Sequence, residues 1–240
     1  MLRILVAACA LAALPVQAQS LTVLCSAQIE WCQLLATVFQ KSTGIRVTMT
    51  QRGSGESIAQ LAAEAANPKI DIWFGGTGDP HLQAAEQNLT AEYRSPSLAQ
   101  LHPWAVRQAE QSKFRTVGIY MGALGFGYNT ELLARRKLPA PACWADLLKP
   151  AYRGEVQMAN PGSSGTAYVA IATLVQLMGE EKAFDYLKKL HANIGQYPRS
   201  GTGPIKNVAR GNTSSHRFPR FCSVCGANST RPACCASRRR

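Results

Sequence analysis

The first part of the chain repeats one order of elements three times: a short strand-like segment, a polar loop and an amphipathic helix. Alternating apolar and polar residues, as in 45–50, are typical of a strand with one buried face, whereas a short apolar run such as 20–26 fits a buried strand. The predicted strands are 20–26, 45–50 and 70–74, and the helices that follow them are 31–43, 58–66 and 81–87. This repetition predicts an α/β protein with a mostly parallel sheet and helices on both faces.

The pattern is less regular beyond these three units. Two apolar runs rich in glycine and aromatic residues, 116–121 and 123–128, are predicted to form adjoining strands. Further strands are predicted at 155–158 and from 196, and helices at 129–137, 167–178, 180–191 and 205–210. Gly44 and Gly179 directly follow predicted helices, where glycine commonly provides the C-terminal cap.

Three loops that lead into helices are rich in glycine and hydroxyl groups: 52–57, 75–80 and 159–168. The first turn of a helix leaves backbone N–H groups unpaired and carries a partial positive charge. Such a terminus can bind a phosphate, phosphonate or carboxylate group. In parallel sheets, the loops that follow the strands gather at the carboxyl ends of the strands, where ligands bind. The loops therefore predict an anion-binding site.

The third of these loops offers the most hydroxyl groups. Ser163, Ser164 and Thr166 would lie beside the first amides of the following helix, and Gly165 has no side chain to obstruct them. An ordinary helix cap is the alternative interpretation, because serine or threonine at this position commonly satisfies the first turn without any ligand.

Motifs for nucleotide binding and for hydrolase nucleophiles are absent. The chain has neither G-x-x-x-x-G-K-[ST] nor G-x-G-x-x-G, and it has no G-x-S-x-G. A secreted enzyme acting on a phosphorylated small molecule would need a base near the loops, and His81, beside Asp79, is the one candidate.

The N-terminus has the features of a secretory signal peptide. Arg3 provides a basic start, residues 4–14 are apolar, and Val16-Gln17-Ala18 is a small-residue cleavage site. The apolar run is too short to span a bilayer. We expect residues 1–18 to be removed after Ala18 and the protein to be exported to the periplasm.

The cysteines divide between the body of the chain and its end. In an oxidising compartment Cys25 and Cys32 are expected to form a short-loop disulfide, which leaves Cys143 without an obvious partner. Zinc is disfavoured for the C-terminal cysteines, because Cys234-Cys235 has the wrong ligand spacing.

Much of the net charge of +12 comes from the end of the chain. Residues 211–240 hold six arginines and no acidic residue, so residues 1–210 carry 12 − 6 = +6. This end has no hydrophobic period, and we expect a disordered basic tail that arises from out-of-frame translation. Nucleic-acid binding by this tail is not expected.

Three stretches together resemble the type II periplasmic solute-binding proteins of ABC importers. They are Asp71-Ile-Trp-Phe-Gly-Gly-Thr-Gly-Asp79, Gly125-Phe-Gly-Tyr-Asn129 and the loop Pro161–Tyr168. The resemblance covers residues 20–210 and is greatest to the ferric-iron-binding branch, which also includes phosphonate and phosphorylated-sugar binders.

The resemblance implies a two-lobed fold that closes on a ligand. The first lobe would be 19–118, the hinge and a partial second lobe 119–210, and the tail 211–240, with 116–128 as the first hinge crossing. The second lobe would be incomplete, because the family's return to the first lobe is missing. The residues expected to line the cleft are Ser26, Ser54, Gly55, Glu56, Gly76, Thr77, Asp79, Ser163, Ser164, Gly165, Thr166 and Tyr168.

The resemblance also implies a binding function without catalysis. The expected ligand is a small phosphonate or phosphorylated anion, or ferric iron with a synergistic anion, delivered by a monomer to an ABC permease at the inner membrane. Ferric iron would be cargo rather than a cofactor. The chain lacks the adjacent tyrosine pair of iron binders, and Glu56, Tyr168 and Tyr197 make an incomplete set of oxygen ligands. A non-functional truncated family member is the alternative.

Overall fold

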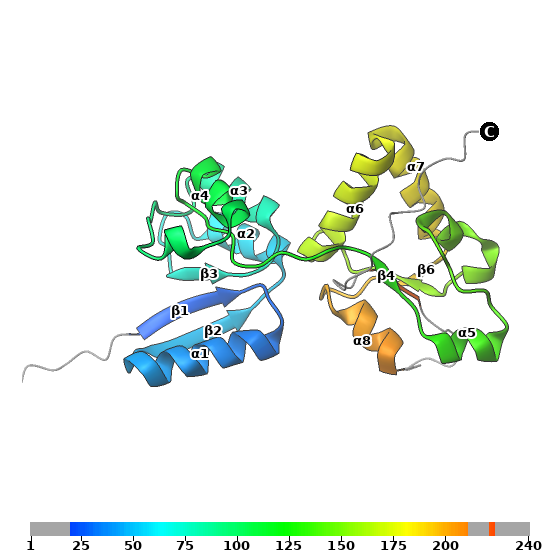
Figure 1. Cartoon of the computed structure of the whole chain (residues 1–240), viewed down its shortest axis with the longest axis horizontal. Coiled ribbons are helices and arrows are strands. Elements are labelled where there is room, and N and C mark those ends of the chain that lie inside the picture. Colours follow the sequence, from blue (N-terminus) through cyan, green and yellow to red (C-terminus); the bar gives the residue numbers. More distant parts are fainter. Residues whose placement is uncertain (1–19, 211–220, 224–240) are drawn as a thin grey trace, which may run out of the picture.

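The computed structural model describes residues 20–210 and 221–223. Two lobes lie side by side and are joined by an extended segment (Figure 1). The predicted signal peptide and its cleavage site lie outside the described residues. The predicted disordered tail does too, apart from 221–223, which form a strand.

The first lobe contains the predicted parallel sheet. Its strands are β1 (Ser20–Cys25), β2 (Arg46–Gln51) and β3 (Ile72–Phe74), in the order β2-β1-β3. Both neighbours run parallel to β1, with Val23 opposite Met49 on one side and Ile72 on the other. The central position of β1 buries Leu24 completely. The prediction of a parallel sheet is confirmed.

Helices cover both faces of this sheet. The helix α1 (Ile29–Thr43) lies on one face, and α2 (Ser54–Ala63), α3 (Gly78–Glu86) and α4 (Pro103–Gln111) lie on the other (Figure 1). A short 3₁₀ turn spans Leu98–Gln100. The helices α2 and α3 begin earlier than predicted, because their glycines and serines occupy the first turn, where the N–H groups need no helical partner and helix propensity matters least.

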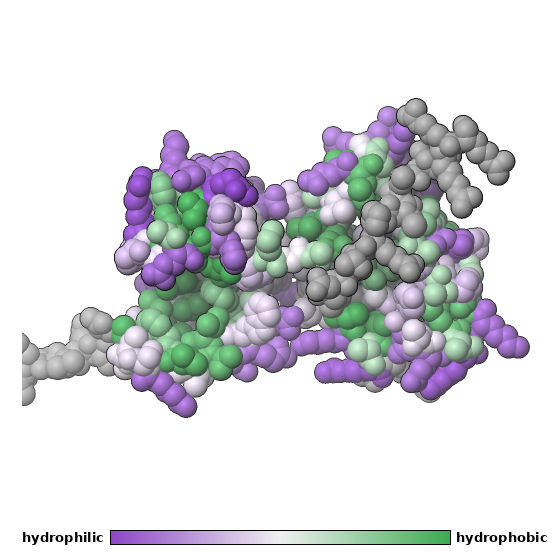
Figure 2. All heavy atoms as spheres, in the orientation of Figure 1, coloured by the Kyte–Doolittle hydropathy of each residue, from purple (hydrophilic) through white to green (hydrophobic). Residues whose placement is uncertain are grey.

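The helix α1 is anchored at both ends as the sequence predicts. The Cys25–Cys32 disulfide joins its first turns to the end of β1, and Gly44, with φ at 73°, provides the C-terminal cap. Its outward face is nevertheless apolar. Figure 2 shows hydrophobic residues over α1. Those with exposed side chains are Trp31, Leu34, Leu35, Val38 and Phe39.

The predicted strand at 116–121 is wrong, and the one at 123–128 is confirmed only in part. Residues 116–125 form neither strand nor helix, and β4 is limited to Phe126–Gly127. The segment crosses between the lobes with no strand beside it among the described residues (Figure 1), so its apolar residues have no ladder to join. Met121, for example, is 70% exposed.

The second lobe is built on a short mixed sheet with the order β4-β7-β5-β6. The strand β5 (Val156–Gln157) runs parallel to β6 (Ile194–Gln196) and to β7 (Phe221–Ser223), and β4 runs antiparallel to β7. Its helices are α5 (Thr130–Arg136), α6 (Gly165–Met178), α7 (Glu180–His191) and α8 (Gly203–Arg210), with 3₁₀ turns at Trp144–Leu148 and Pro150–Tyr152.

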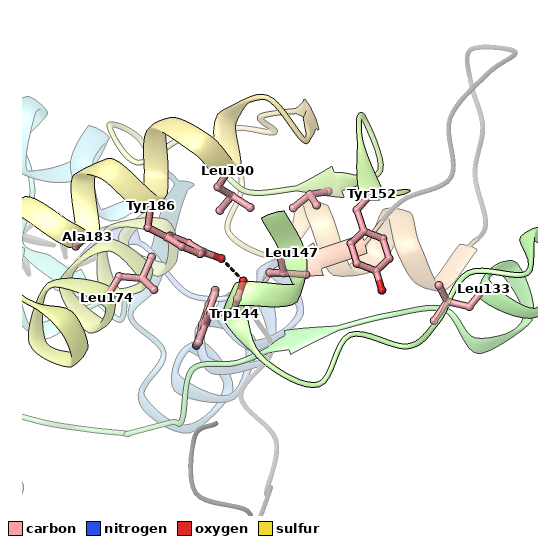
Figure 3. Packing of buried hydrophobic residues seen from close by; sticks show 9 residues of the cluster. Leu133, Trp144, Leu147, Tyr152, Leu174, Ala183, Tyr186 and Leu190 are labelled. Carbon is pink, nitrogen blue, oxygen red and sulfur yellow. Dashed lines mark hydrogen bonds between the residues drawn. The ribbon is translucent and has the colours of Figure 1, made fainter. Parts of the chain in front are cut away.

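The largest hydrophobic cluster holds the second lobe together. It joins α6 and α7 to the 3₁₀ turns beneath them, as Figure 3 shows. Tyr186 donates a hydrogen bond of 2.5 Å from its hydroxyl to the carbonyl oxygen of Trp144, so a buried polar group is satisfied inside the apolar cluster. The buried members are Leu133, Trp144, Leu147, Tyr152, Val156, Leu174, Ala183, Tyr186 and Leu190.

Glu155 is a buried carboxylate at the edge of this cluster. Burial raises its pKa to about 7, although Arg136 Nη1 lies 3.1 Å from its Oε1 and favours the charged form. Its other oxygen, Oε2, is buried without a hydrogen-bond partner within the described ranges. The unfolded chain would titrate near the ordinary value of 4.5. The folded protein therefore binds this proton more tightly than the unfolded chain does.

The stabilisation from protonated Glu155 is complete below pH 4.5 and is lost as the pH rises through about 7. The difference amounts to at most about 3 kcal/mol. Glu155→Gln should therefore reduce the fall in melting temperature between pH 5 and pH 8. Glu131→Gln, at an exposed position on α5, is the control and should keep the wild-type slope. An unchanged slope in Glu155→Gln would contradict this account.

Candidate functional site

The N-termini of α2 and α3 meet in the first lobe. Ser54 opens α2 and is 3% exposed. Its Oγ accepts a hydrogen bond of 3.2 Å from the backbone N–H of Thr77, the residue that precedes α3. The two loops predicted from their glycine and hydroxyl content are thus joined directly.

The N-terminus of α6 reaches the same place from the second lobe. The N–H of Gly55 donates to the carbonyl oxygen of Ser163 at 3.3 Å. Gly165 lies so close to the first lobe that a Cβ there would be 2.4 Å from Thr77 Oγ1 and 2.6 Å from Ser54 Oγ. Three helix N-termini from two lobes therefore converge at one location, which we call the junction.

Thr77 carries a polar atom at the junction that has no partner. Its Oγ1 is buried and makes no hydrogen bond to any residue that the structure describes. A buried hydroxyl without a partner lowers stability by roughly 1–3 kcal/mol. Such an atom beside helix N-termini is available to a ligand that brings its own hydrogen-bonding group.

Ser26 and Gly76 belong to the wall behind the junction. Ser26 Oγ lies 2.8 Å from Ser57 Oγ and accepts a hydrogen bond of 2.8 Å from the indole N–H of Trp73. A Cβ at Gly76 would meet Ser54 Oγ at 2.5 Å, so the two loops pack in direct contact. Ser26 therefore already has partners and supports the loops.

The hydroxyls of the third loop have differing environments. Ser164 caps α6, since its Oγ accepts from the N–H of Ala167 at 3.3 Å, so the ordinary cap interpretation is confirmed for this residue. Ser163 Oγ donates to the carbonyl oxygen of Arg199 at 2.9 Å. Thr166 Oγ1 packs against Gly201, where a Cβ would approach it to 2.5 Å. The loop that precedes α8 is thereby joined to the junction.

Two predicted site residues have exposed side chains that do not join the junction. Asp79, on the first turn of α3, and Tyr168, on α6, are exposed. Neither side chain forms a hydrogen bond or ion pair with another residue in 20–210. Both retain the freedom to contact a ligand, but the structure itself does not connect them to the junction.

An ion pair across the lobes was missed in the sequence analysis. Arg199 Nη2 contacts Glu56 Oε1, and Glu56 Oε2 accepts a hydrogen bond of 3.2 Å from the N–H of Gly53. The hydrogen bond from Arg199 is the main cause of a lowered pKa at Glu56, and the Gly53 N–H adds to it. A second pair joins Lys206 on α8 to Glu30 on α1 at 3.2 Å. The sequence offered one signal that Arg199 belongs to the site: it is a basic residue in a glycine- and hydroxyl-rich loop that leads into a helix.

Tyr120 was also missed as a residue near the loops. Its hydroxyl accepts from the N–H of Gly76 at 2.7 Å and donates to the carbonyl oxygen of Gly76 at 3.0 Å. Burial raises its pKa. The crossing segment is in this way fastened to the loop that precedes α3.

His81, the candidate base of an enzyme, is engaged in packing. Its ring stacks on Trp73 with centroids 3.7 Å apart, and Nε2 lies 2.8 Å from the carbonyl oxygen of Gly75. Burial lowers its pKa. The ring is thus neutral near pH 7 and is held by the first lobe's own groups.

Over the described stretches, no group of three or more histidine, cysteine, aspartate or glutamate residues is placed to hold a metal ion. No helix in the same stretches has the length and apolar character to cross a membrane. A cavity of about 350 Å³ lies in the second lobe between α5 and α8, away from the junction, where the lobes are in direct contact.

Comparison with known proteins places the chain among extracellular binding proteins. Residues 67–221 match the model of a family described as bacterial extracellular solute-binding protein. The solved periplasmic binding protein AfuA from Actinobacillus pleuropneumoniae, with exogenous fructose-6-phosphate bound, is 42% identical and superposes with a TM-score of 0.76, over 85% of this chain and 63% of that one.

Two curated relatives are similar over much of the chain. A Haemophilus influenzae protein is 45% identical over 80% of this chain and 56% of its own length. A Salmonella typhimurium protein, provisionally named as 2-aminoethylphosphonate-binding and periplasmic, is 32% identical over 73% of this chain and 48% of its own. The chain spans about half the length of the curated relatives it matches.

Proposed function

Because the chain belongs to the family of bacterial extracellular solute-binding proteins, we propose that it binds a small phosphorylated or phosphonate anion at the junction between its lobes. The observation that carries this proposal is the convergence of α2, α3 and α6, with the unpartnered hydroxyl of Thr77 among their N-termini. The family is one of binding proteins, and no catalytic step is part of the proposal.

The chemistry of the junction favours an anion. Each helix N-terminus directs unpaired N–H groups and a partial positive charge toward the ligand, and each contributes roughly 0.3–1 kcal/mol. The amides at Ser54, Gly165 and Thr166 would donate to the anionic oxygens, and the Thr77 hydroxyl would gain a partner. Of the remaining predicted residues, Ser26, Gly76 and Ser164 shape the walls, and Ser163 fixes the neighbouring loop. Glu56 pairs with Arg199, and Asp79 and Tyr168 are exposed.

Two similar proteins support the same ligand class. AfuA was solved with fructose-6-phosphate, and the Salmonella relative is provisionally named for a phosphonate. Both ligands carry a phosphorus-centred anion, which is the group that helix N-termini bind well. Ferric iron is less well supported, because residues 20–210 contain no group of three or more histidine, cysteine, aspartate or glutamate residues placed to hold a metal ion, and Glu56 is already paired with Arg199.

The same family supports a role in import. We propose that the protein acts in the periplasm as a monomer and delivers its ligand to an ABC permease at the inner membrane. The two lobes and the segment 116–125 that crosses between them fit a protein that closes around a solute and opens to release it (Figure 1).

Thermal unfolding with added ligands tests the proposal. We expect D-fructose 6-phosphate, 2-aminoethylphosphonate or inorganic phosphate to raise the melting temperature, since a ligand at about 100 times its dissociation constant stabilises the native state by about 2.7 kcal/mol. D-fructose, which lacks the anion, is the matched control and should leave it unchanged. The proposal would be refuted if only ferric citrate raised the melting temperature. It would also be refuted if none of the phosphorus compounds raised it.

A further inference from the structure

Glu56 makes the two kinds of contact that an anionic ligand would make at the junction. One carboxylate oxygen accepts from the backbone N–H of Gly53, at the start of α2, at 3.2 Å. The other contacts the guanidinium of Arg199, which belongs to the second lobe. A phosphate group bound between the lobes would seek the same donors, a helix N-terminal N–H and a guanidinium.

Arg199 is well placed to exchange one anion for another. Its side chain is 80% exposed, so a solute can reach the guanidinium, whereas the Glu56 side chain is 24% exposed. Its backbone is fixed, because its carbonyl oxygen accepts a hydrogen bond from Ser163 Oγ at 2.9 Å. The carbonyl oxygen of the preceding Pro198 accepts another from the N–H of Asn160 at 2.8 Å. The Arg199 backbone is therefore held beside α6, while its exposed guanidinium can exchange one anionic partner for another.

We propose that Arg199 is the residue that selects a phosphate or phosphonate dianion, and that Glu56 occupies it in the absence of ligand. This inference rests on the proposed function. When the solute enters, its phosphate group takes over the Arg199 guanidinium, and the Glu56 carboxylate is released toward solvent while it keeps its hydrogen bond to Gly53.

Charge gives the direction of this exchange. A phosphate dianion carries about twice the charge of a carboxylate and accepts two parallel N–H bonds from a guanidinium, so it competes effectively for Arg199. The released Glu56 carboxylate remains near Arg52, whose charge also favours its ionised form. A neutral sugar has no anionic group that could replace the Glu56 carboxylate, so the ion pair between Glu56 and Arg199 would persist.

Titration calorimetry of the full chain with inorganic phosphate and with D-fructose 6-phosphate tests this exchange. Arg199→Gln should weaken binding of both about 10- to 100-fold, the loss typical of a charge-assisted hydrogen bond. Glu56→Gln should tighten binding about fivefold, because it removes a competing negative charge but keeps the side-chain oxygen that caps α2. The double variant should bind like Arg199→Gln.

Arg135→Gln is the matched control, since Arg135 is also exposed and paired with a glutamate, Glu131, but lies within α5. It should bind like the wild type. Circular dichroism of each variant establishes that it is folded. If Arg199→Gln binds like the wild type, or Glu56→Gln binds more weakly, this inference is wrong while the proposed function stands. If the folded wild type binds neither compound, both fail.

Discussion

Gly53→Ala is expected to weaken binding of a phosphorylated ligand about 10- to 100-fold while both lobes stay folded. A Cβ at Gly53 would lie 2.0 Å from the carbonyl oxygen of Ser163, a backbone atom of the opposite lobe. Neither backbone can yield locally, so the lobes must separate at the junction. Forced overpacking of this kind typically costs about 1–3 kcal/mol, which sets the expected loss.

Gly53→Ala should affect only the contact between the two lobes. Gly53 has φ at −68° and ψ at 159°, a conformation that alanine adopts readily, so the open form is unaffected. Gly122→Ala is the control, because a Cβ there meets nothing within 4 Å. Calorimetric affinity and melting temperature would be measured for both. An affinity of Gly53→Ala within about threefold of the wild type would show that ligand binding does not need the contact between the lobes.

Leu174→Ala is expected to reduce the free energy of unfolding of the second lobe by about 2–5 kcal/mol. Leu174 is 1% exposed and packs in the cluster with Tyr186 and Trp144, so truncation removes buried apolar surface and leaves a cavity (Figure 3). Leu177→Ala is the control on the same helix, because Leu177 is 42% exposed. Urea unfolding monitored by tryptophan fluorescence, with Trp144 inside the cluster, provides the measurement.

Equal effects of the two leucine substitutions would contradict this account of the core. A loss below about 1 kcal/mol at Leu174 would do so as well, since it would mean that the cluster is not closely packed around α6.

Local patterns located the three strands of the first lobe and the helices α1, α2 and α3 that follow them. The strands are marked by alternation or by a short apolar run, whereas α4 was not placed by such a pattern. The loops at Ser54 and Ser164 could be recognised as helix starts because their residue types satisfy N-terminal amides. The Cys25–Cys32 disulfide was expected from the short separation of the two cysteines and from the oxidising compartment that the sequence analysis predicts.

Interactions between distant residues could not be recognised in this way. Arg199 and Glu56 are 143 positions apart, and nothing in their neighbourhoods indicates that they meet. The strand prediction for 116–125 failed for a related reason. Its apolar residues have the composition of a strand, but a strand also needs a neighbouring strand. Among the described residues, this segment crosses between the lobes without one.

A titration of ¹⁵N-labelled protein with D-fructose 6-phosphate, followed by amide chemical shifts, tests the central claim most directly. Binding at the junction predicts the largest shifts at the amides of Ser54, Gly55, Thr77, Gly165 and Thr166, with no change on addition of D-fructose. Shifts centred instead on the cavity between α5 and α8, around Tyr128 and Ile205, or the absence of any shift at millimolar ligand, would contradict it.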